Sequence, residues 1–315
     1  MFNRKKISIV SSCYNEAENI EEFFEKVDLQ LQKFKDRYDY EKIMVDNCST
    51  DGTVQKLKAL AQKDKTNKVI FNSRNFGHIR AQYHAKMTAS GDAVIYLASD
   101  LQDPPELISK FIEKWEEGYK IVIGVKDQSK ENFLVFAIRK FFYFFIDKIS
   151  DDNTKMTKNF TGFGLYDRQI IDICKTVDDP YPYFRGLISE VGFDKFIIPF
   201  VQPRRKNGVT KHNFYSLYDY AMNGIIKHSK VPLRLMTFAG FILSVLSMFI
   251  AFVYLVYKLL FWQYFELGLA PIAIGLFFFA SVQLFSIGIL GEYIGAIYTR
   301  INKRPLVVEK ERINF

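Results

Sequence analysis

The sequence predicts an α/β fold with a mostly parallel sheet, followed by interfacial helices and two transmembrane helices. As far as Val125, short apolar runs alternate with helical patterns of roughly ten to fifteen residues, which is typical of a parallel sheet covered on both faces. The last third contains two apolar runs that each exceed the roughly 20 residues needed to cross a bilayer. With 315 residues, the chain is long enough for one α/β domain and a smaller second part.

The predicted strands and helices follow one another in alternation. The strands are expected at residues 7–10, 42–45, 69–71, 93–97 and 121–125. The helices are expected at residues 17–34, 54–63, 77–89 and 106–117. Because the strand at 93–97 contains no charged residue, we expect it to lie buried in the centre of the sheet.

Two apolar runs predict a transmembrane hairpin. Residues 235–262 contain one charge, Lys258, and residues 267–298 contain one, Glu292. Basic residues precede the first run and follow the second, whereas the connecting loop has almost no positive charge. By the positive-inside rule, we expect a multi-pass protein of the cytoplasmic (inner) membrane, with both termini and the α/β domain in the cytosol. The expected domains are a cytosolic domain at 1–230, the hairpin at 231–300 and a cytosolic tail at 301–315.

Two further segments are predicted to be helices that lie in the membrane interface. Residues 133–149 are almost wholly apolar and aromatic, and their charged side chains fall on one helical face. These charged residues are Arg139, Lys140, Asp147 and Lys148. A segment with charges near its middle is a poor membrane span and suits the interface, the alternative being a buried amphipathic core helix. Residues 212–230 form a second, more polar candidate.

The composition favours a membrane partner over nucleic acid. The net charge is +8, and the basic residues cluster beside very apolar segments, as expected for contact with an anionic membrane surface. The cysteines Cys13, Cys48 and Cys174 lack metal-ligand spacing and suit a reducing compartment. The first apolar run, at 7–13, is too short for the hydrophobic region of a cleavable signal, so we expect none.

The residues after the strand at 93–97 form the first candidate site. Asp100, Gln102 and Asp103 follow the carboxyl end of this strand, where open α/β sheets bind ligands. Their hard oxygen atoms suit Mg²⁺ or Mn²⁺ beside a diphosphate. Asp103 has an alternative role as the cap of a helix whose first turn contains two prolines. We expect Asp103 mainly to cap the helix, and Asp100 and Gln102 to be the metal ligands.

Two other loops, at 14–16 and 46–53, carry polar residues at strand ends. If they converge with the first site on one edge of the sheet, the three loops form a cleft of nucleotide size. Asp46 could accept hydrogen bonds from a base or ribose. Its alternative role is to cap the following helix, for which Asp51 and Ser49 are better placed.

A further phosphate contact is predicted where the third strand leads into the next helix. Arg74 or His78 could meet a phosphate at the N-terminus of that helix. A lone histidine more often has a structural role, which is the alternative for His78.

Three motifs resemble those of family-2 glycosyltransferases, and the most similar group is the polyprenyl-phosphate glycosyltransferases. The motifs are Cys13-Tyr14-Asn15-Glu16, the segment 46–53 (Asp-Asn-Cys-Ser-Thr-Asp-Gly-Thr) and the segment 100–106 (Asp-Leu-Gln-Asp-Pro-Pro-Glu). Thr210-Lys211 and the segment 290–295 extend the resemblance over nearly the whole chain. It implies a GT-A-type domain that transfers a sugar, with inversion, from a nucleotide-diphosphate sugar to a polyprenyl phosphate.

The resemblance also implies roles for individual residues. The base and ribose would be held by Tyr14, Glu16 and Asp46. The Mg²⁺ or Mn²⁺ ion would be held by Asp100 and Gln102. The phosphates of the donor or the lipid acceptor would be approached by Arg204, Arg205 and Lys211. The expected catalytic residues are Asp100, Asp103 and Arg205, and Arg74 and His78 complete the substrate-binding set. Nucleic acid is not an expected partner, and a homo-oligomer stays open.

The chain departs from the family pattern at catalytic positions. The usual Asp-Ala-Asp is Ala98-Ser99-Asp100, so one metal ligand is missing. The usual Asp-Asp-Gly-Ser is Asp-Asn-Cys-Ser at 46–49, and the usual Gly-Asp-Phe-Arg is Thr-Gly-Phe-Gly at 161–164, which lacks the acid and the arginine. Candidates to replace them are Asp167, Arg168 and Arg185, although surface ion pairing is the commoner role of the first two.

Two other functions stay open. One is a polysaccharide-synthase-like family-2 transferase with another acceptor, but its Gln-x-x-Arg-Trp type of motif is not found in the sequence. The other is a catalytically impaired membrane scaffold that binds a nucleotide. The missing acids favour the scaffold, whereas Asp46, Asp100, Gln102 and the basic segment 204–211 argue against it.

Overall fold

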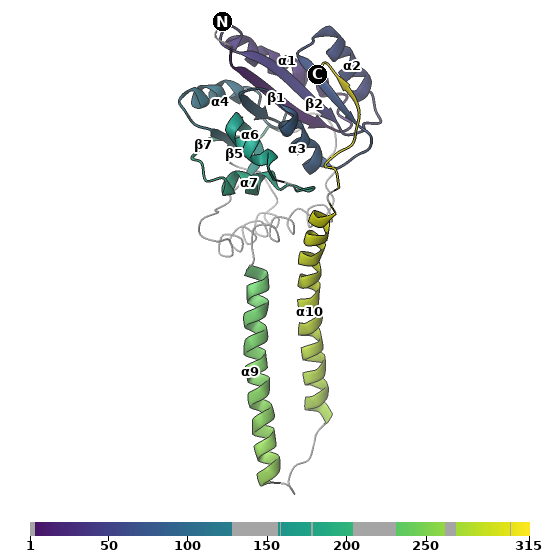
Figure 1. Ribbon diagram of the computed structural model, residues 1–315, viewed down its shortest axis with the longest axis vertical. Coiled ribbons are helices and arrows are strands. Elements are labelled where there is room, and N and C mark those ends of the chain that lie inside the picture. The colour runs from purple at the N-terminus through teal and green to yellow at the C-terminus, as the bar shows by residue number, and fades with distance from the viewer. Residues whose placement is uncertain are drawn as a thin grey trace.

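A mixed sheet of eight strands organises the N-terminal part of the chain, and two long helices extend from it (Figure 1). The computed structural model describes residues 4–127, 157, 159–177, 179–203, 231–261, 269–302 and 304–315. The predicted fold class, an α/β fold with a mostly parallel sheet followed by two long apolar helices, is confirmed.

Every strand and helix predicted before residue 127 is present, with ends shifted by a few residues. The strands are β1 (Lys6–Cys13), β2 (Asp39–Asp46), β3 (Asn67–Asn72), β4 (Ala93–Tyr96), β5 (Ile121–Lys126), β6 (Phe160–Asp167), β7 (Lys195–Phe200) and β8 (Glu309–Ile313). The helices are α1 (Ile20–Leu31), the 3₁₀-helix η1 (Gln32–Phe34), α2 (Thr53–Lys63), α3 (His78–Thr88), α4 (Leu107–Glu116), α6 (Arg168–Lys175), α7 (Phe184–Glu190), α9 (Val231–Leu260) and α10 (Leu269–Ile301). The sequence patterns did not predict β6, β7, β8, α6 or α7.

Four neighbouring strands, in the order β4-β1-β2-β3, are parallel to one another, and β7 also pairs in parallel with β5. The strand order is β7-β5-β6-β4-β1-β2-β3-β8. β1 pairs in parallel with β2 and β4, and β2 pairs in parallel with β3. β6 runs antiparallel between β4 and β5, and β8 runs antiparallel to β3. The carboxyl ends of β1 to β4 therefore meet at one edge, which is where such sheets bind ligands.

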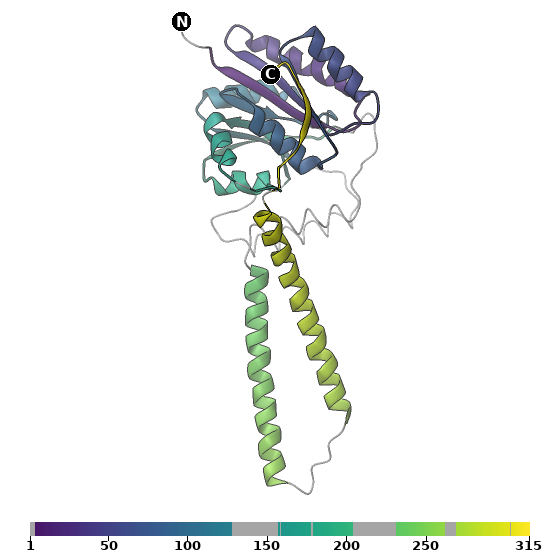
Figure 2. The same cartoon turned by 45° about the vertical axis from the view of Figure 1, so that its right-hand side comes forward.

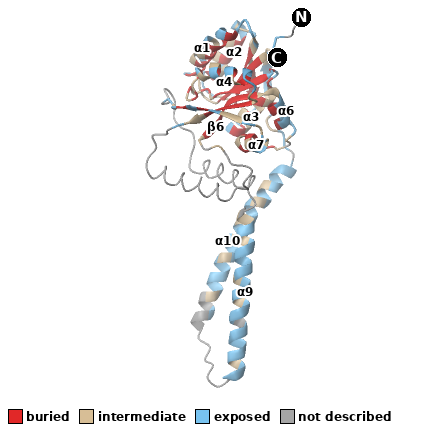
Figure 3. Cartoon of the chain, turned by 90° about the vertical axis from the view of Figure 1, so that its left-hand side faces the viewer, coloured by how far each residue is buried: buried red, intermediate tan, exposed pale blue. Residues whose placement is uncertain are grey.

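Two apolar layers cover the faces of the sheet, because successive residues of a strand point to opposite sides. In β1, Ile9 belongs to the layer with residues of α1, α2 and α4, whereas Val10 belongs to the layer with residues of α3, α6 and α7. All residues of β4 are buried, as expected for a central strand. Figure 3 shows this buried interior beside the exposed surfaces of α9 and α10.

The C-terminal segment, predicted as a cytosolic tail, contributes an edge strand to the sheet. In β8, Ile313 lies opposite Val69 of β3. The side-chain amide of Asn314 donates to the carbonyl oxygens of Ala61 at 2.7 Å and of Asn67 at 2.8 Å. Figure 2 shows this segment returning from α10 along the sheet. Both ends of the α9–α10 pair therefore connect to the same sheet domain.

Two helices in the described part of the chain are long and apolar enough to cross a membrane. The candidate spans are Pro232–Leu260 and Gly275–Ile301, and no part of either apolar window is buried inside the protein. They correspond to the predicted runs at 235–262 and 267–298. The predicted interfacial helices at 133–149 and 212–230 lie outside the described residues.

Candidate functional site

The structure brings the three polar loops of the sequence analysis to one edge of the sheet. Cys13 at the end of β1 lies opposite Asp46 at the end of β2, and its carbonyl accepts a hydrogen bond from the N–H of Asn47 at 2.9 Å. On the other side of β1, the hydroxyl of Ser99 donates to the carbonyl of Ser12 at 3.1 Å. The loops after β1, β2 and β4 are therefore neighbours, as a nucleotide-sized cleft requires.

Hydrogen bonds between the loops after β1 and β2 fix the position of Tyr14 and Glu16. The N–H of Asn15 donates to the hydroxyl of Ser49 at 2.8 Å, and the N–H of Glu16 donates to that of Thr53 at 2.9 Å. Asn15 has a φ of 55°, which an asparagine tolerates well. Tyr14 and Glu16 are both half-buried at this edge. Their expected contact with a base or ribose stays a prediction.

Asp46 is the last residue of β2, lies between these loops and is only 1% exposed. Its Oδ2 accepts a hydrogen bond from the N–H of Ser49 at 3.1 Å, and its Oδ1 accepts one from the thiol of Cys13 at 3.7 Å. Burial raises the pKa of the Asp46 carboxyl. Asp46 does not cap α2, because Asp51 accepts the N–H of Thr53 at 3.0 Å. Asp46 therefore holds the turn that follows β2.

Asp100 and Gln102 lie half-buried beyond the carboxyl end of β4. Oδ1 of Asp100 accepts a hydrogen bond from the N–H of Gln102 at 3.1 Å, and Leu101 between them has a φ of 59°. In the described part of the chain, no group of three or more His, Cys, Asp or Glu side chains gathers around a possible metal position. The predicted set of one carboxylate and one amide matches the way Mg²⁺ is often held, through few protein ligands and several substrate phosphate oxygens.

Asp103 does not cap α4, so this prediction is wrong. The helix begins only at Leu107, so the N-cap residue is Glu106, and no side chain caps the helix. Pro104 and Pro105 lack the N–H groups that a carboxylate at position 103 would bind. The Asp103 carboxylate turns back instead, and its Oδ2 accepts a hydrogen bond from the N–H of Ala98 at 3.0 Å. Asp103 is 4% exposed, and burial raises its pKa to about 6.

Lys86 is a fully buried lysine next to this turn, and no sequence pattern predicted its burial. Its Nζ lies 3.6 Å from the ring centre of Tyr96 and 4.5 Å from that of Phe184. Burial lowers the pKa of Lys86 well below its usual value, while its charge acts on Asp103 to lower the pKa of that carboxyl. In sequence, Lys86 is one of many lysines on helices, and nothing in its spacing marks it as buried.

Arg74 and His78 lie at the start of α3, where the sequence analysis expected a phosphate contact. Arg74 is exposed, and its guanidinium lies 4.1 Å from the ring centre of Phe76. His78 is the first residue of α3 and is also exposed. Their contact with a phosphate stays a prediction.

An asparagine network ties this β3–α3 loop to the loop after β2. Oδ1 of Asn47 accepts hydrogen bonds from the side-chain amide of Asn72 at 3.1 Å and from the N–H of Phe76 at 3.0 Å. The side-chain amide of Asn47 donates to Oδ1 of Asn75 at 2.7 Å. Asn47 occupies the place of the second acid in the usual family motif, and its amide group supplies both the acceptor and the donor that this network needs.

Gly162 and Gly164 occupy the positions of the missing family acid and arginine, and the backbone at both positions favours glycine. Gly162 has a φ of 99°, which disfavours any L side chain. A Cβ atom at Gly164 would lie 2.4 Å from the carbonyl oxygen of Val122, a backbone atom of the paired strand. The chain therefore cannot accept the usual acid and arginine at these positions without a change in β6.

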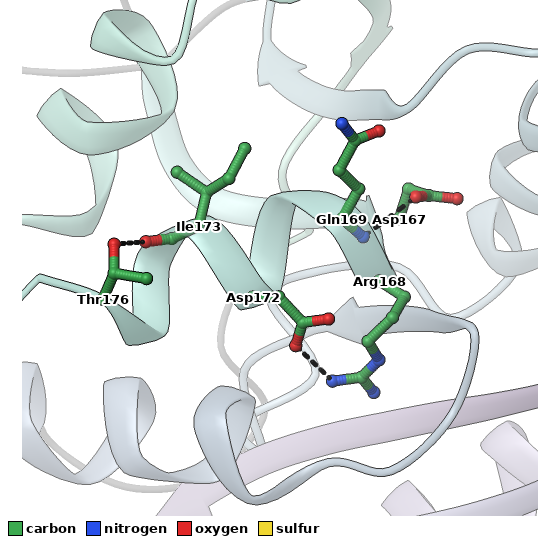
Figure 4. Close-up of a pocket in the computed structure, with 6 residues that line it drawn as sticks. All are labelled: Asp167, Arg168, Gln169, Asp172, Ile173 and Thr176. Atoms are coloured by element: carbon green, nitrogen blue, oxygen red, sulfur yellow. Dashed lines mark hydrogen bonds and ion pairs between the residues drawn. The ribbon is translucent and has the colours of Figure 1, made fainter.

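Asp167 and Arg168 do not replace these residues, because they lie at the opposite edge of the sheet. Asp167 lies opposite Ala93, at the amino end of β4. It accepts hydrogen bonds from the N–H of Gln169 at 3.0 Å and from the indole of Trp115 at 2.8 Å. Figure 4 shows the shallow pocket of about 630 Å³ at this edge, where Asp172 pairs with Arg168 at 3.6 Å.

Three predicted phosphate-binding residues lie outside the described residues: Arg204, Arg205 and Lys211. The third candidate replacement, Arg185, donates a hydrogen bond to the carbonyl of Phe160 at 3.2 Å. It therefore supports the start of β6.

A family model and two relatives are similar to this chain over much of its length. The model of glycosyl transferase family 2 matches residues 8–173. An uncharacterized glycosyltransferase of Synechocystis sp. is 34% identical over 96% of this chain and 93% of its own length. The bactoprenol glucosyl transferase of Shigella phage SfII is 33% identical over 97% of this chain and 98% of its own length. Among solved structures, a mannosyltransferase of Pyrobaculum calidifontis is 14% identical, with a TM-score of 0.46 over 95% of this chain and 88% of that one.

Proposed function

The chain belongs to glycosyltransferase family 2, and on this premise we propose that it transfers a sugar from a nucleotide-diphosphate sugar to a polyprenyl phosphate. The full-length similarity to a phage bactoprenol glucosyl transferase supports this acceptor class. The observation that carries the proposal is the junction of the loops after β1, β2 and β4 at one sheet edge, with Asp46 after β2 and Asp100 after β4, on either side of β1. This is the arrangement that a nucleotide donor requires.

In the proposed reaction, the donor binds across this edge. Tyr14 and Glu16 lie on the loop after β1 and contact the base and ribose above the turn that Asp46 shapes. Asp100 and Gln102 would hold Mg²⁺ or Mn²⁺ beside the diphosphate. When bound, the ion neutralises the negative charge that develops on the departing nucleoside diphosphate. Asp103 supports Asp100 from below through the N–H of Ala98.

The acceptor phosphate is the nucleophile in this proposal. One of its oxygens bonds to the anomeric carbon while the bond from that carbon to the donor diphosphate breaks, and the electron pair leaves with the diphosphate. In-line attack inverts the anomeric centre. Because the second pKa of a phosphate monoester is about 6, this oxygen is largely ionised at neutral pH and needs no strong general base. The absence of an acid at Gly162 is compatible with this chemistry, and Arg205 and Lys211 are proposed to bind the acceptor phosphate.

The membrane arrangement proposed is a hairpin with both termini and the transferase domain in the cytosol. The fold supports it, because α10 leads back into the sheet from which the chain departs before α9. Two crossings return the chain to the starting side, whereas one crossing would separate β8 from β3. The proposed domains are a transferase domain at residues 1–230 and a transmembrane hairpin at residues 231–300. The segment after residue 301 adds the strand β8 to the sheet of the transferase domain.

The test is product formation by the full chain in neutral detergent. The protein is incubated with a panel of nucleotide sugars, a polyprenyl phosphate and Mg²⁺ or Mn²⁺, and lipid products are identified by mass spectrometry. A polyprenyl phosphate carrying one added sugar supports the proposal. Nucleotide binding without any transfer would instead support the catalytically impaired scaffold, and a polymeric product would support the polysaccharide-synthase alternative.

A further inference from the structure

A basic cavity lies beside the candidate cleft, between the β3–α3 loop and the segment that follows α10. It has a volume of about 680 Å³. Its lining includes Arg74, Arg80 and Arg304, together with Tyr181, and it contains no carboxylate among the described residues. The three arginines come from the β3–α3 loop, from α3 and from the C-terminal segment, so only the tertiary fold brings them together.

Arg80 is the most enclosed of the three arginines that line this cavity. Its Nε atom is buried and has no hydrogen-bond partner within the described part of the chain. Its guanidinium group lies 5.4 Å from the ring centre of Tyr181. Burial lowers the pKa of Arg80, and the like charges of Arg74 and Arg304 act in the same direction, against the opposing effects of Tyr181 and Asp179. An anion in the cavity would offset the repulsion between the guanidinium groups of Arg74, Arg80 and Arg304.

The cavity lies where the candidate membrane span joins the sheet domain. Arg304 follows shortly after Ile301, the last residue of the span Gly275–Ile301. Figures 1 and 2 both show the chain passing from the end of α10 directly into the sheet domain. A ligand in this cavity therefore lies at the height expected for lipid head groups, next to an apolar helix.

The lining chemistry matches a phosphate group. Arginine presents a fixed fork of N–H donors that binds phosphate oxygens in pairs, and a phosphate offers enough oxygens for more than one guanidinium group. Gly77, directly before α3, also lines the cavity, so the positive end of that helix dipole adds to the field.

We propose that this cavity binds the phosphate group of a membrane lipid. Two lipids carry the required chemistry: the polyprenyl phosphate acceptor, whose involvement rests on the proposed function, and an anionic phospholipid, whose involvement does not. Neither Asp46 nor Asp100 lines the cavity, and contacts of Asn47 and Cys48 with the β3–α3 loop connect it to the loop after β2.

The test measures lipid binding to the full chain in neutral detergent, so it does not depend on turnover. Native mass spectrometry gives apparent Kd values for a polyprenyl phosphate, for phosphatidylglycerol and for phosphatidylcholine, which has no net charge. The variants are Arg80→Gln and Arg304→Gln. The matched control is Arg300→Gln, because Arg300 is an exposed arginine at the end of α10 that does not line the cavity. Melting temperatures identify any variant that fails to fold, and Arg304, being exposed, can be replaced without disturbing the core.

We expect wild type to bind at least one anionic lipid about tenfold more tightly than phosphatidylcholine, and both cavity variants to lose about tenfold of that affinity, the effect of one lost charged contact. Arg300→Gln should change it by less than about twofold. If the cavity variants lose affinity for the polyprenyl phosphate alone, the cavity binds the acceptor lipid. If they lose affinity for phosphatidylglycerol, the cavity binds a phospholipid head group. No preference in wild type, or equal loss in Arg300→Gln, overturns the proposal in favour of diffuse membrane electrostatics. Reduced affinity for uridine or guanosine diphosphate with unchanged lipid affinity overturns it in favour of the donor site.

Discussion

The N–H of Ala98 donates a hydrogen bond to the buried Oδ2 of Asp103, 3.0 Å away. This bond closes the turn that presents Asp100 at the carboxyl end of β4. Because Asp103 is only 4% exposed, burial raises its pKa to about 6 in spite of this hydrogen bond and of the nearby charges of Lys126 and Lys86.

Asp103→Asn should change the pH dependence of stability. Between its ordinary pKa of 3.8 and the folded value of about 6, the folded chain binds more protons at Asp103 than the unfolded chain. The contribution of Asp103 to stability therefore falls as pH rises through this window, by about 3 kcal/mol in total. Asparagine keeps the acceptor for Ala98 but does not titrate. The stability of the variant relative to wild type should rise from pH 4 to pH 7 in denaturant unfolding, and a constant difference would contradict the raised pKa.

Asp100→Ala should reduce metal-dependent binding of a nucleoside diphosphate by at least about tenfold, as expected for loss of a charged contact. Since Ala98 cannot ligate, the site depends on Asp100 as its principal carboxylate. Calorimetry with and without Mn²⁺ measures the effect. The control is Asp172→Ala, which removes an exposed acid of α6 at the opposite edge of the sheet. Unchanged affinity and metal dependence in the Asp100 variant would remove this residue from the site.

Gly164→Ala should destabilise the protein by about 1–3 kcal/mol, because overpacking against backbone is poorly relieved. The added Cβ would lie 2.4 Å from the carbonyl oxygen of Val122 and 3.0 Å from Cα of Ile123. Gly52→Ala is the control, since its Cβ would meet only the Cβ of Ala17, at 3.7 Å. Thermal unfolding in detergent compares the two variants, and equal melting temperatures would show that β6 can move away from β5.

Asn47→Ala should weaken donor binding through the β3–α3 loop. The change leaves two buried donors without their acceptor, the amide of Asn72 and the N–H of Phe76, at about 1–3 kcal/mol each. Asn314→Ala is the matched control, because it removes hydrogen bonds to two backbone carbonyls at the far edge of the sheet. Both variants should lower the melting temperature, but only Asn47→Ala should raise the Kd for a nucleoside diphosphate. If Asn47→Ala and Asn314→Ala changed the Kd for the nucleoside diphosphate equally, the asparagine network around Asn47 would contribute to stability alone.

Deleting residues 309–315 should lower the melting temperature and promote aggregation, because it uncovers the backbone groups of β3 at the sheet edge. It also removes the ion pair between Glu311 and Lys58, which are 2.7 Å apart. Lys310→Ala, an exposed substitution on the same strand, is the control and should behave as wild type. Normal stability of the deletion variant would show that β8 is dispensable. A soluble form made by cutting the chain at residue 230 would lose β8 as well.

Local patterns in the sequence were sufficient for the elements of the parallel sheet and for the loops of the candidate site. Apolar periodicity and turn residues act over a few positions, so they located β1 to β5, their helices and the segments around Tyr14, Asp46 and Asp100. They did not locate β6 or β8. Glycines interrupt the apolar pattern of β6, and charged residues fill most of β8. Only the pairing of β6 with β4 and β5, and of β8 with β3, identifies them as strands.

The sequence by itself determined the family resemblance, the α/β class and the two apolar spans, because each depends on residues close together in the chain. The tertiary structure alone decided the role of Asp103, the burial of Lys86 and the commitment of Gly164 to glycine. It also brought Arg80 and Arg304 to one cavity, although more than two hundred residues separate them. Burial, steric exclusion and the pairing of charges depend on distances between remote segments, and only the folded chain sets those distances.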